Sequence, residues 1–440
     1  MGQLAYVLKR EQQNQNFASV YTLAASQMIA AFAHKHTYTV SRDLGVSIDS
    51  ISSIAPCTPL QEGMIFRCLS SDRPLYFGSF HFLLLSSTNI QKLKEAWETV
   101  VARTQILRTC FSLTTDGYAQ VVIEKQTMAW DEIYIPNEEK TKAIIENRYL
   151  TWCRKTRDLR NTPFEAVIIR SPRRTVMCLH IFHALYDGNS LPMLLMRVRM
   201  EYAGLSNIDY GPPFQKVLPH GPLCESEGAK EFWVQHLSDS QFHQIPPLAP
   251  ESPPGDSFVT VDLMVAELEA TRRSLNTTHQ ALIQACWISV LRKYFGGSIT
   301  IGMVVSGRSI DFENVENTIG PLFNTIPFYI SLEQTDTWVS LVKKCHHSNA
   351  AVLPHQHTAL RDIMKWCGRS SDKALFDTLF VFHRNEEHQT PRLRDLWTPI
   401  YSKSPTDVAS LSLIQMGETS LLTSSSTLWH SRPITSQAAP

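Results

Sequence analysis

The chain has 440 residues, of which 43% are hydrophobic and 19% are charged. This length and composition predict a globular protein with enough apolar residues to build two compact lobes. Basic and acidic residues balance at 41 each, so we expect neither a nucleic acid nor a membrane as the main partner. Nine cysteines without a CxxC pair indicate free thiols, and we expect a cytoplasmic protein.

The first part of the chain, residues 1–52, is predicted to be a helical lead-in. Its opening residues are polar and charged, so they do not resemble a signal peptide. Residues 17–32 lean apolar but are too few and too polar to span a bilayer. Pro56 and Pro59 then predict a turn before a helix.

Strands and helices mix along the predicted N-terminal lobe, residues 53–225. Apolar and aromatic runs predict strands at 76–85, 106–111, 118–123, 164–169 and 175–182. Helical spacing of apolar residues predicts helices near 60, at 90–104, 140–156 and 191–202. The Pro- and Gly-rich segment 203–256 is the best candidate for a linker between lobes, with a short helix at 230–237.

The predicted C-terminal lobe, residues 226–407, has the same mixture. Strands are expected at 258–268, 298–305, 325–332 and 375–382, and helices at 278–294 and 337–348. Without regular βαβ alternation, this order predicts α+β lobes with mixed sheets. The tail, residues 408–440, is dominated by Ser, Thr and Leu, and we expect it to be atypical and partly disordered.

Chemistry concentrates in the segment HIFHALYDGNS, residues 180–190. His183 follows a strand and has an ordinary pKa near ~6.5, which suits proton transfer at neutral pH. Asp187 can fix the loop by pairing with an arginine, and the N–H of Gly188 can stabilise an oxyanion. Regular alternation would place His180 and His183 on opposite faces, which argues against a metal site. We expect His180 to be a packed structural residue.

Six ordered segments carry a wider resemblance. They are CTPLQEGM (57–64), ILRTCF (106–111), FHALYDGNS (182–190), VVSGR (304–308), GPLFNTIPF (320–328) and ALFDTLFVF (374–382). Together they resemble condensation domains of nonribosomal peptide synthetases, closest to those of fungal siderophore (ferrichrome-type) synthetases. The resemblance covers about four fifths of the chain, roughly residues 55–407.

The resemblance implies two chloramphenicol-acetyltransferase-like lobes in a V-shaped pseudo-dimer with a tunnel between them. It implies amide-bond formation between a carrier-bound acyl or peptidyl thioester and a carrier-bound aminoacyl amine. Donor and acceptor carrier domains would supply phosphopantetheine arms, no cofactor would be bound directly, and other synthetase modules would be partners.

The resemblance also assigns residues. His183 takes the position of the catalytic histidine, with Gly188 beside it. Asp187 matches the structural aspartate and Arg308 its salt-bridge partner. The predicted tunnel residues are Phe182, Asn189, Ser190, Ser306 and Asn324.

Several positions depart from the family pattern. The first histidine of the usual pair is Phe182, the frequent Trp after Asp-Gly is Asn189, and a usual Arg is Tyr329. Two alternatives therefore stay open. One is a coenzyme-A-dependent HxxxD acyltransferase, against which the TPLQEGM segment and the lack of a DFGWG-like motif argue. The other is a degenerate, non-catalytic domain that only docks carriers, to which the altered tail also points.

Overall fold

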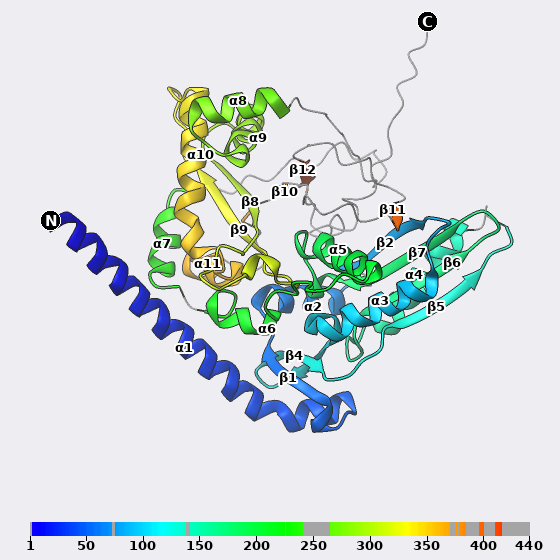
Figure 1. Cartoon of the computed structure of the whole chain (residues 1–440). Helices are drawn as coiled ribbons and strands as arrows, with labels where there is room; N and C mark the ends of the chain where they lie inside the picture. Colours follow the sequence, from blue (N-terminus) through cyan, green and yellow to red (C-terminus); the bar gives the residue numbers. More distant parts are fainter. Residues whose placement is uncertain are drawn as a thin grey trace, which may run out of the picture. The chain divides into compact units, whose positions relative to one another are not determined.

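The computed structural model describes residues 2–72, 75–137, 141–224, 226–240, 265–369, 375–376, 378–383, 396–399 and 410–415 (Figure 1). The chain forms two compact units, each discontinuous in sequence. Unit 1 comprises residues 1–227, 306–323 and 392–398, and unit 2 comprises residues 228–305, 324–391 and 399–440. The predicted lobes are contiguous, whereas residues 306–323 and 396–398 belong to unit 1. The local spacing of apolar residues does not reveal that the connection between two strands of unit 2 belongs to unit 1.

A five-stranded mixed sheet forms the centre of unit 1, in the order β11-β2-β7-β6-β5. The pairs β2–β7 and β7–β6 are antiparallel, whereas β6–β5 is parallel. The strands are β2 (Phe77–Leu84), β5 (Ala129–Tyr134), β6 (Phe164–Arg170), β7 (Thr175–Phe182) and β11 (Trp397–Pro399). β7 is central and buried almost throughout, because its run of apolar residues packs on both faces.

Helices cover this sheet. α4 (Thr141–Thr156) places Ile144 and Ile145 against one face, and α3 (Ile90–Arg103) packs Trp97 against Phe164 of β6. α5 (Ser190–Ala203) contacts α3 and begins directly after the predicted catalytic loop. Because β7 pairs with β2 in a fixed register, the predicted catalytic loop leaves the sheet at the end of β7.

The helical lead-in is one long helix, α1 (Gly2–Leu44), and belongs to unit 1. Phe32 and Val40 pack on a second sheet of unit 1, ordered β1-β4-β3, beside which α1 ends (Figure 1). Its strands are β1 (Ile51–Pro56), β3 (Thr109–Thr114) and β4 (Gly117–Ile123). The lead-in thus contributes core residues to unit 1.

Two details of the first lobe differ from the sequence prediction. Residues 105–108 form a 3₁₀ turn (η2, Gln105–Arg108), so the strand predicted at 106–111 begins only at Thr109. The candidate linker also folds in part, since α6 (Phe214–Val217) and η5 (Leu218–His220) bury Phe214, Val217 and Leu218. Residues 241–256 of that linker lie outside the described part of the chain.

Unit 2 contains a four-stranded mixed sheet in the order β12-β10-β8-β9. β8 is antiparallel to β9 and parallel to β10, and β12 is antiparallel to β10. The strands are β8 (Ile299–Val305), β9 (Asn324–Ile330), β10 (Thr378–His383) and β12 (Ser410–Gln415). The helices are α7 (Ala229–His236), α8 (Val265–Leu275), α9 (His279–Phe295), α10 (Trp338–Val352) and α11 (Leu360–Trp366).

Two corrections concern unit 2. The strand predicted at 258–268 is wrong over residues 265–268, which begin helix α8, and the rest of it lies outside the described residues. The atypical tail contains strand β12, whose alternating SLSLIQ sequence suits a strand; the remaining tail residues lie outside the description.

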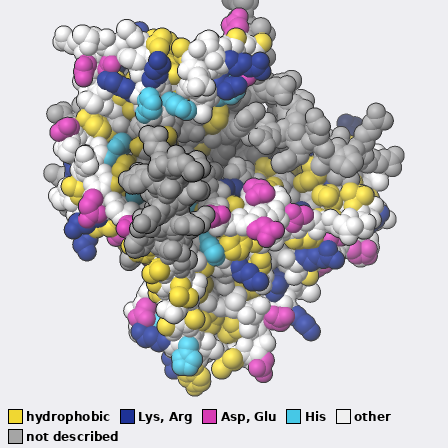
Figure 2. Space-filling view, turned by 60° about the vertical axis from the view of Figure 1, so that its left-hand side comes forward, with side chains coloured by type: hydrophobic (Ala, Val, Ile, Leu, Met, Phe, Trp, Pro, Cys, Tyr) yellow, Lys and Arg dark blue, Asp and Glu magenta, His cyan; other side chains and the backbone are white. Residues whose placement is uncertain are grey.

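The fold is α+β with a mixed sheet in each unit, as the sequence predicts. Among the described side chains on the face shown in Figure 2, basic and acidic ones are interspersed without a large patch of one sign. Among the described helices, none combines the length and the hydropathy that crossing a bilayer requires.

Candidate active site

His183 lies where β7 ends and the short 3₁₀ turn η4 (His183–Leu185) begins. Its backbone N–H donates to the carbonyl oxygen of Tyr76 at 2.8 Å. The next peptide is fixed by Gln61, whose Nε2 donates to the carbonyl oxygen of Ala184 at 3.0 Å. The turn is therefore held on both sides by segments distant in sequence.

Gln61 is itself fixed by the start of α2 (Pro59–Ser70). Thr58 caps this helix, and the backbone N–H of Thr58 donates to Oε1 of Gln61 at 3.0 Å, which completes a capping box. Gln61 is fully buried. The helix start predicted near residue 60 is confirmed, and this helix supplies a side chain that supports the His183 turn.

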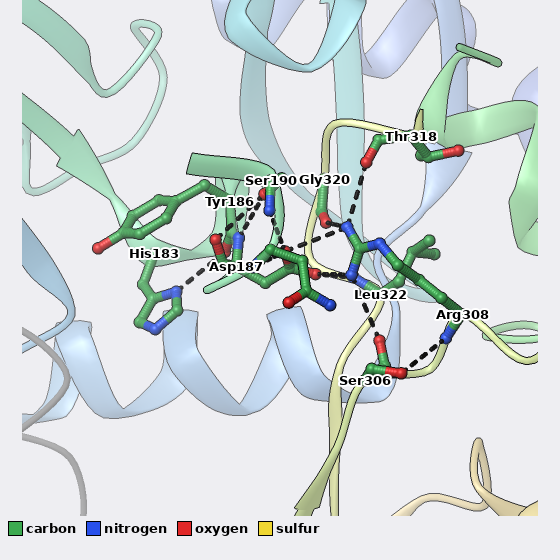
Figure 3. A network of polar contacts seen from close by, with 10 residues as sticks. His183, Tyr186, Asp187, Ser190, Ser306, Arg308, Thr318, Gly320 and Leu322 are labelled. Atoms are coloured by element: carbon green, nitrogen blue, oxygen red, sulfur yellow. Dashed lines mark hydrogen bonds and ion pairs between the residues drawn. The ribbon is translucent and has the colours of Figure 1, made fainter. Parts of the chain in front are cut away.

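The imidazole of His183 is held in one tautomer. Its Nδ1 lies 3.0 Å from the carbonyl oxygen of Tyr186 (Figure 3). A carbonyl only accepts, so Nδ1 carries the proton and the neutral ring keeps its lone pair on Nε2. Within the described residues, Nε2 has no hydrogen-bond partner. It is therefore the atom able to accept a proton from a substrate.

Burial sets the charge of this ring. The residue is only 8% exposed, and burial lowers the pKa of His183, while the hydrogen bond to Tyr186 and the charge of Asp187 oppose that shift. A lowered pKa keeps the imidazole neutral at neutral pH, which is the protonation state that a general base needs.

Asp187 does not contact this imidazole and instead organises the loop around it. Its Oδ1 accepts the backbone N–H groups of Asn189 at 3.1 Å and Ser190 at 2.7 Å, at the start of α5. Its Oδ2 accepts the backbone N–H of Leu322 at 3.1 Å. One carboxylate thus satisfies donors from two segments that are more than 130 residues apart.

Arg308 completes this network (Figure 3). Its Nη1 donates to Oδ2 of Asp187 at 2.7 Å and its Nη2 donates to Oδ1 at 3.1 Å, a bidentate pair. Nη2 also donates to the carbonyl oxygen of Thr318 at 3.1 Å. The two side chains are 3% and 9% exposed. The structure therefore brings together the two residues that the motifs suggested as partners.

Two of the predicted tunnel residues, Phe182 and Ser190, are fully buried. Phe182 packs its ring 5.0 Å from that of Phe77 and 6.2 Å from that of Phe111. Ser190 accepts the backbone N–H of Asp187 on its Oγ at 2.7 Å. Neither side chain presents surface to a substrate, because β7 turns Phe182 into the core and Ser190 closes the first turn of α5.

The remaining predicted residues are placed as follows. Gly188 and Asn189 are exposed on the loop after Asp187, so the backbone of Gly188 is open to a substrate and its role in binding an oxyanion stays a prediction. Ser306 is exposed and its Oγ accepts the backbone N–H of Arg308 at 3.4 Å. Asn324 lies in unit 2, where its Nδ2 donates to the carbonyl oxygens of residues 356 and 358. Its amide is therefore engaged within that unit.

His180 is a structural residue in this arrangement. It is 1% exposed and stacks on Trp152, with ring centroids 5.3 Å apart and planes 28° apart. Neither ring nitrogen has a hydrogen-bond partner among the described residues. In the same part of the chain, no group of three or more His, Cys, Asp or Glu side chains could hold a metal ion.

Sequence reasoning missed two residues that contact the loop of His183. Gln61 has a detectable signal, since it occupies the third helical position after Thr58 in a capping box. Tyr186 has none, because its contacts with His183 depend on a turn that only the folded chain reveals.

Comparison with known proteins gives consistent findings. The family model described as condensation domain matches residues 51–410. The nonribosomal peptide synthetase sidC of Arthroderma benhamiae is 42% identical over 385 residues, which are 87% of this chain and 8% of that protein. The ferrichrome siderophore peptide synthetase of Mycosarcoma maydis is 28% identical over 376 residues, which are 78% of this chain and 9% of that protein.

A solved structure shares the fold. The first condensation domain of the calcium-dependent antibiotic synthetase, in complex with a substrate analogue, superposes with a TM-score of 0.57 at 14% identity. The superposition covers 76% of this chain and 88% of that one. The chain spans less than a tenth of the length of the two curated relatives named above.

Proposed function

Because this chain belongs to the condensation-domain family, we propose that it forms amide bonds in nonribosomal peptide synthesis. The donor is an acyl or peptidyl thioester on one carrier domain, and the acceptor is an aminoacyl amine on another. The observation that carries the proposal is the imidazole of His183, which has its Nδ1 proton committed to Tyr186 and its Nε2 free to accept.

The proposed reaction follows from this geometry. The amine nitrogen attacks the thioester carbonyl, the C–N bond forms, and the C–S bond breaks. Nε2 of His183 takes the proton that the amine loses and passes it to the departing thiolate. The backbone N–H of Gly188 is the proposed donor to the oxyanion of the intermediate. Most of the acceleration comes from positioning two tethered reactants, since aminolysis of a thioester is already favourable.

The partners and setting are also proposals. Phosphopantetheine arms on carrier domains present both substrates, and other synthetase modules supply them. The similarity to a ferrichrome siderophore peptide synthetase supports a siderophore product. The nine cysteines are free thiols, which supports a reducing, cytoplasmic setting.

The departure at Phe182 does not favour a non-catalytic domain. Its ring fills the core between Phe77 and Phe111 without disturbing the turn that carries His183. The buried pair of Asp187 and Arg308 is also intact.

A reconstituted single-turnover assay tests the proposal. The full chain is mixed with an aminoacyl carrier and either an acyl carrier or acyl-coenzyme A, and amide product is measured by mass spectrometry. We expect product only with the acyl carrier, and a loss of about 100-fold or more in rate for His183→Ala. The matched control is His34→Ala, which removes an exposed histidine of α1.

Each contrary outcome has a definite meaning. Product from acyl-coenzyme A alone would identify the HxxxD acyltransferase alternative. No amide from the wild-type chain with competent carriers would identify the docking-only alternative. An unchanged rate in folded His183→Ala would remove the general base.

A further inference from the structure

We propose that Tyr186 is a positioning residue for the imidazole of His183, and that Gly78 is the residue that makes room for it. The inference rests on the proposed function, because it concerns the same imidazole. It adds two residues to which neither the motifs nor the family resemblance gave a role.

Tyr186 contacts His183 in two different ways. Its backbone carbonyl accepts the Nδ1 proton at 3.0 Å. Its phenol ring stacks on the imidazole, with centroids 4.5 Å apart and planes only 15° apart. The hydrogen bond sets the direction of Nδ1 and the stack sets the plane of the ring. Together they determine where Nε2 points, which a lone hydrogen bond would leave free to rotate.

The phenol ring is a fixed platform. Tyr186 is 4% exposed, and Phe80 meets its ring edge-on with centroids 5.8 Å apart. Phe323 adds another ring 5.3 Å from the imidazole, tilted by 33°. Aromatic neighbours pack against both the phenol ring and the imidazole. A displaced phenol ring would therefore displace the imidazole that stacks on it.

Gly78 explains how the phenol ring fits. It lies inside β2, opposite Ile181 of β7, where glycine usually marks a close approach. A Cβ atom at this position would lie 2.7 Å from the hydroxyl oxygen of Tyr186. The same atom would lie 3.0 Å from the ring of Phe80 and 3.3 Å from the carbonyl oxygen of Ile181. A methyl group there must displace the phenol ring, since the backbone oxygen is fixed by the sheet.

Four variants of the full chain test this inference. Tyr186→Leu removes the ring, and Gly78→Ala pushes it aside. Tyr186→Phe keeps the ring but deletes the oxygen that the new methyl group would meet. The double variant Gly78→Ala with Tyr186→Phe should therefore recover what Gly78→Ala loses. The matched control is Gly63→Ala in α2, where an added Cβ has no atom within 4 Å.

Two readouts are needed. The first is the NMR signal of the His183 ring in histidine-labelled protein, assigned with His183→Ala; stacking on Tyr186 shifts it by ring current. The second is the single-turnover rate of amide formation. We expect Tyr186→Leu and Gly78→Ala to lose the ring-current shift and about 10- to 100-fold in rate. Tyr186→Phe and the double variant should keep the shift and most of the rate.

The outcomes separate this inference from the proposed function. A wild-type chain that shows the ring-current shift but makes no amide refutes the proposed function and supports the stacking. A folded Tyr186→Leu or Gly78→Ala variant with the wild-type rate, while His183→Ala is slow, overturns the positioning role. If Tyr186→Leu does not fold, failure of the double variant to recover from Gly78→Ala overturns it instead.

Discussion

Replacing Asp187 with alanine is expected to destabilise unit 1 by about 3–5 kcal/mol, because it leaves a buried arginine without its counter-charge. Arg308 is 9% exposed on its side chain and donates two hydrogen bonds to the carboxylate. Three backbone N–H groups, those of Asn189, Ser190 and Leu322, lose their acceptor in the same substitution. The N–H groups of Ser190 and Leu322 are buried, so leaving them without an acceptor adds to the cost, and the upper part of this range is the better expectation.

The size of the effect identifies its cause. Asp187→Ala combined with Arg308→Met removes the orphaned charge and should recover part of the loss. The matched control is Asp158→Ala, which breaks an exposed pair with Arg160 in the same unit and should cost under about 1 kcal/mol. If Asp187→Ala loses much stability and Asp158→Ala does not, the cause is the burial of the ion pair and not the removal of a charge in general.

The assay is urea unfolding followed by tryptophan fluorescence, with midpoint and slope compared among the variants. Asp187→Ala should move the midpoint to lower urea, and the double variant should return part of that shift. An Asp187→Ala protein with the midpoint of the Asp158→Ala control would refute the reasoning. So would a double variant less stable than Asp187→Ala itself.

Two further predictions concern buried positions on β7. Burial lowers the pKa of His180 from 6.5 to about 3, so stability should be complete above pH 6.5 and fall as the pH drops from there towards 3, by about 1.4 kcal/mol per unit. Unfolding midpoints measured at pH 7 and pH 5 would show this loss of stability. An equally large loss between the two pH values in the His180→Leu variant would contradict it. Phe182→His restores the usual family residue, yet it should destabilise the chain by about 1–3 kcal/mol, since it buries a polar ring beside Phe77. A Phe182→His variant with higher stability or a faster single-turnover rate would show that phenylalanine impairs the protein at this position.

Local chemistry was enough to place many of the elements. Thr58 and Pro59 begin α2 as their capping and φ preferences require. β7 occupies the predicted residues 175–182, because a long apolar run bounded by polar residues suits a central strand. The strands β1 and β5 were missed, since their mixed sequences become strands only by pairing with β4 and β6.

In the candidate site, too, local sequence identifies some residues and tertiary contacts determine the others. His183, Asp187 and Arg308 could be named because their spacing follows the chemistry of the loop and the family motifs. Gln61 and Tyr186 could not, because their contacts arise where a helix start and a turn meet in space. Burial of Phe182 and Ser190 also depends on tertiary packing, which a motif does not specify.

The path of the chain around Arg308 limits how this protein can be divided. Residues 306–323 belong to unit 1, yet both of their ends continue into strands of unit 2. A piece ending at residue 227 would retain His183 and Asp187 and lack the arginine. Splitting or recombining the chain anywhere between residues 187 and 308 would therefore separate a carboxylate from its only arginine partner among the described residues.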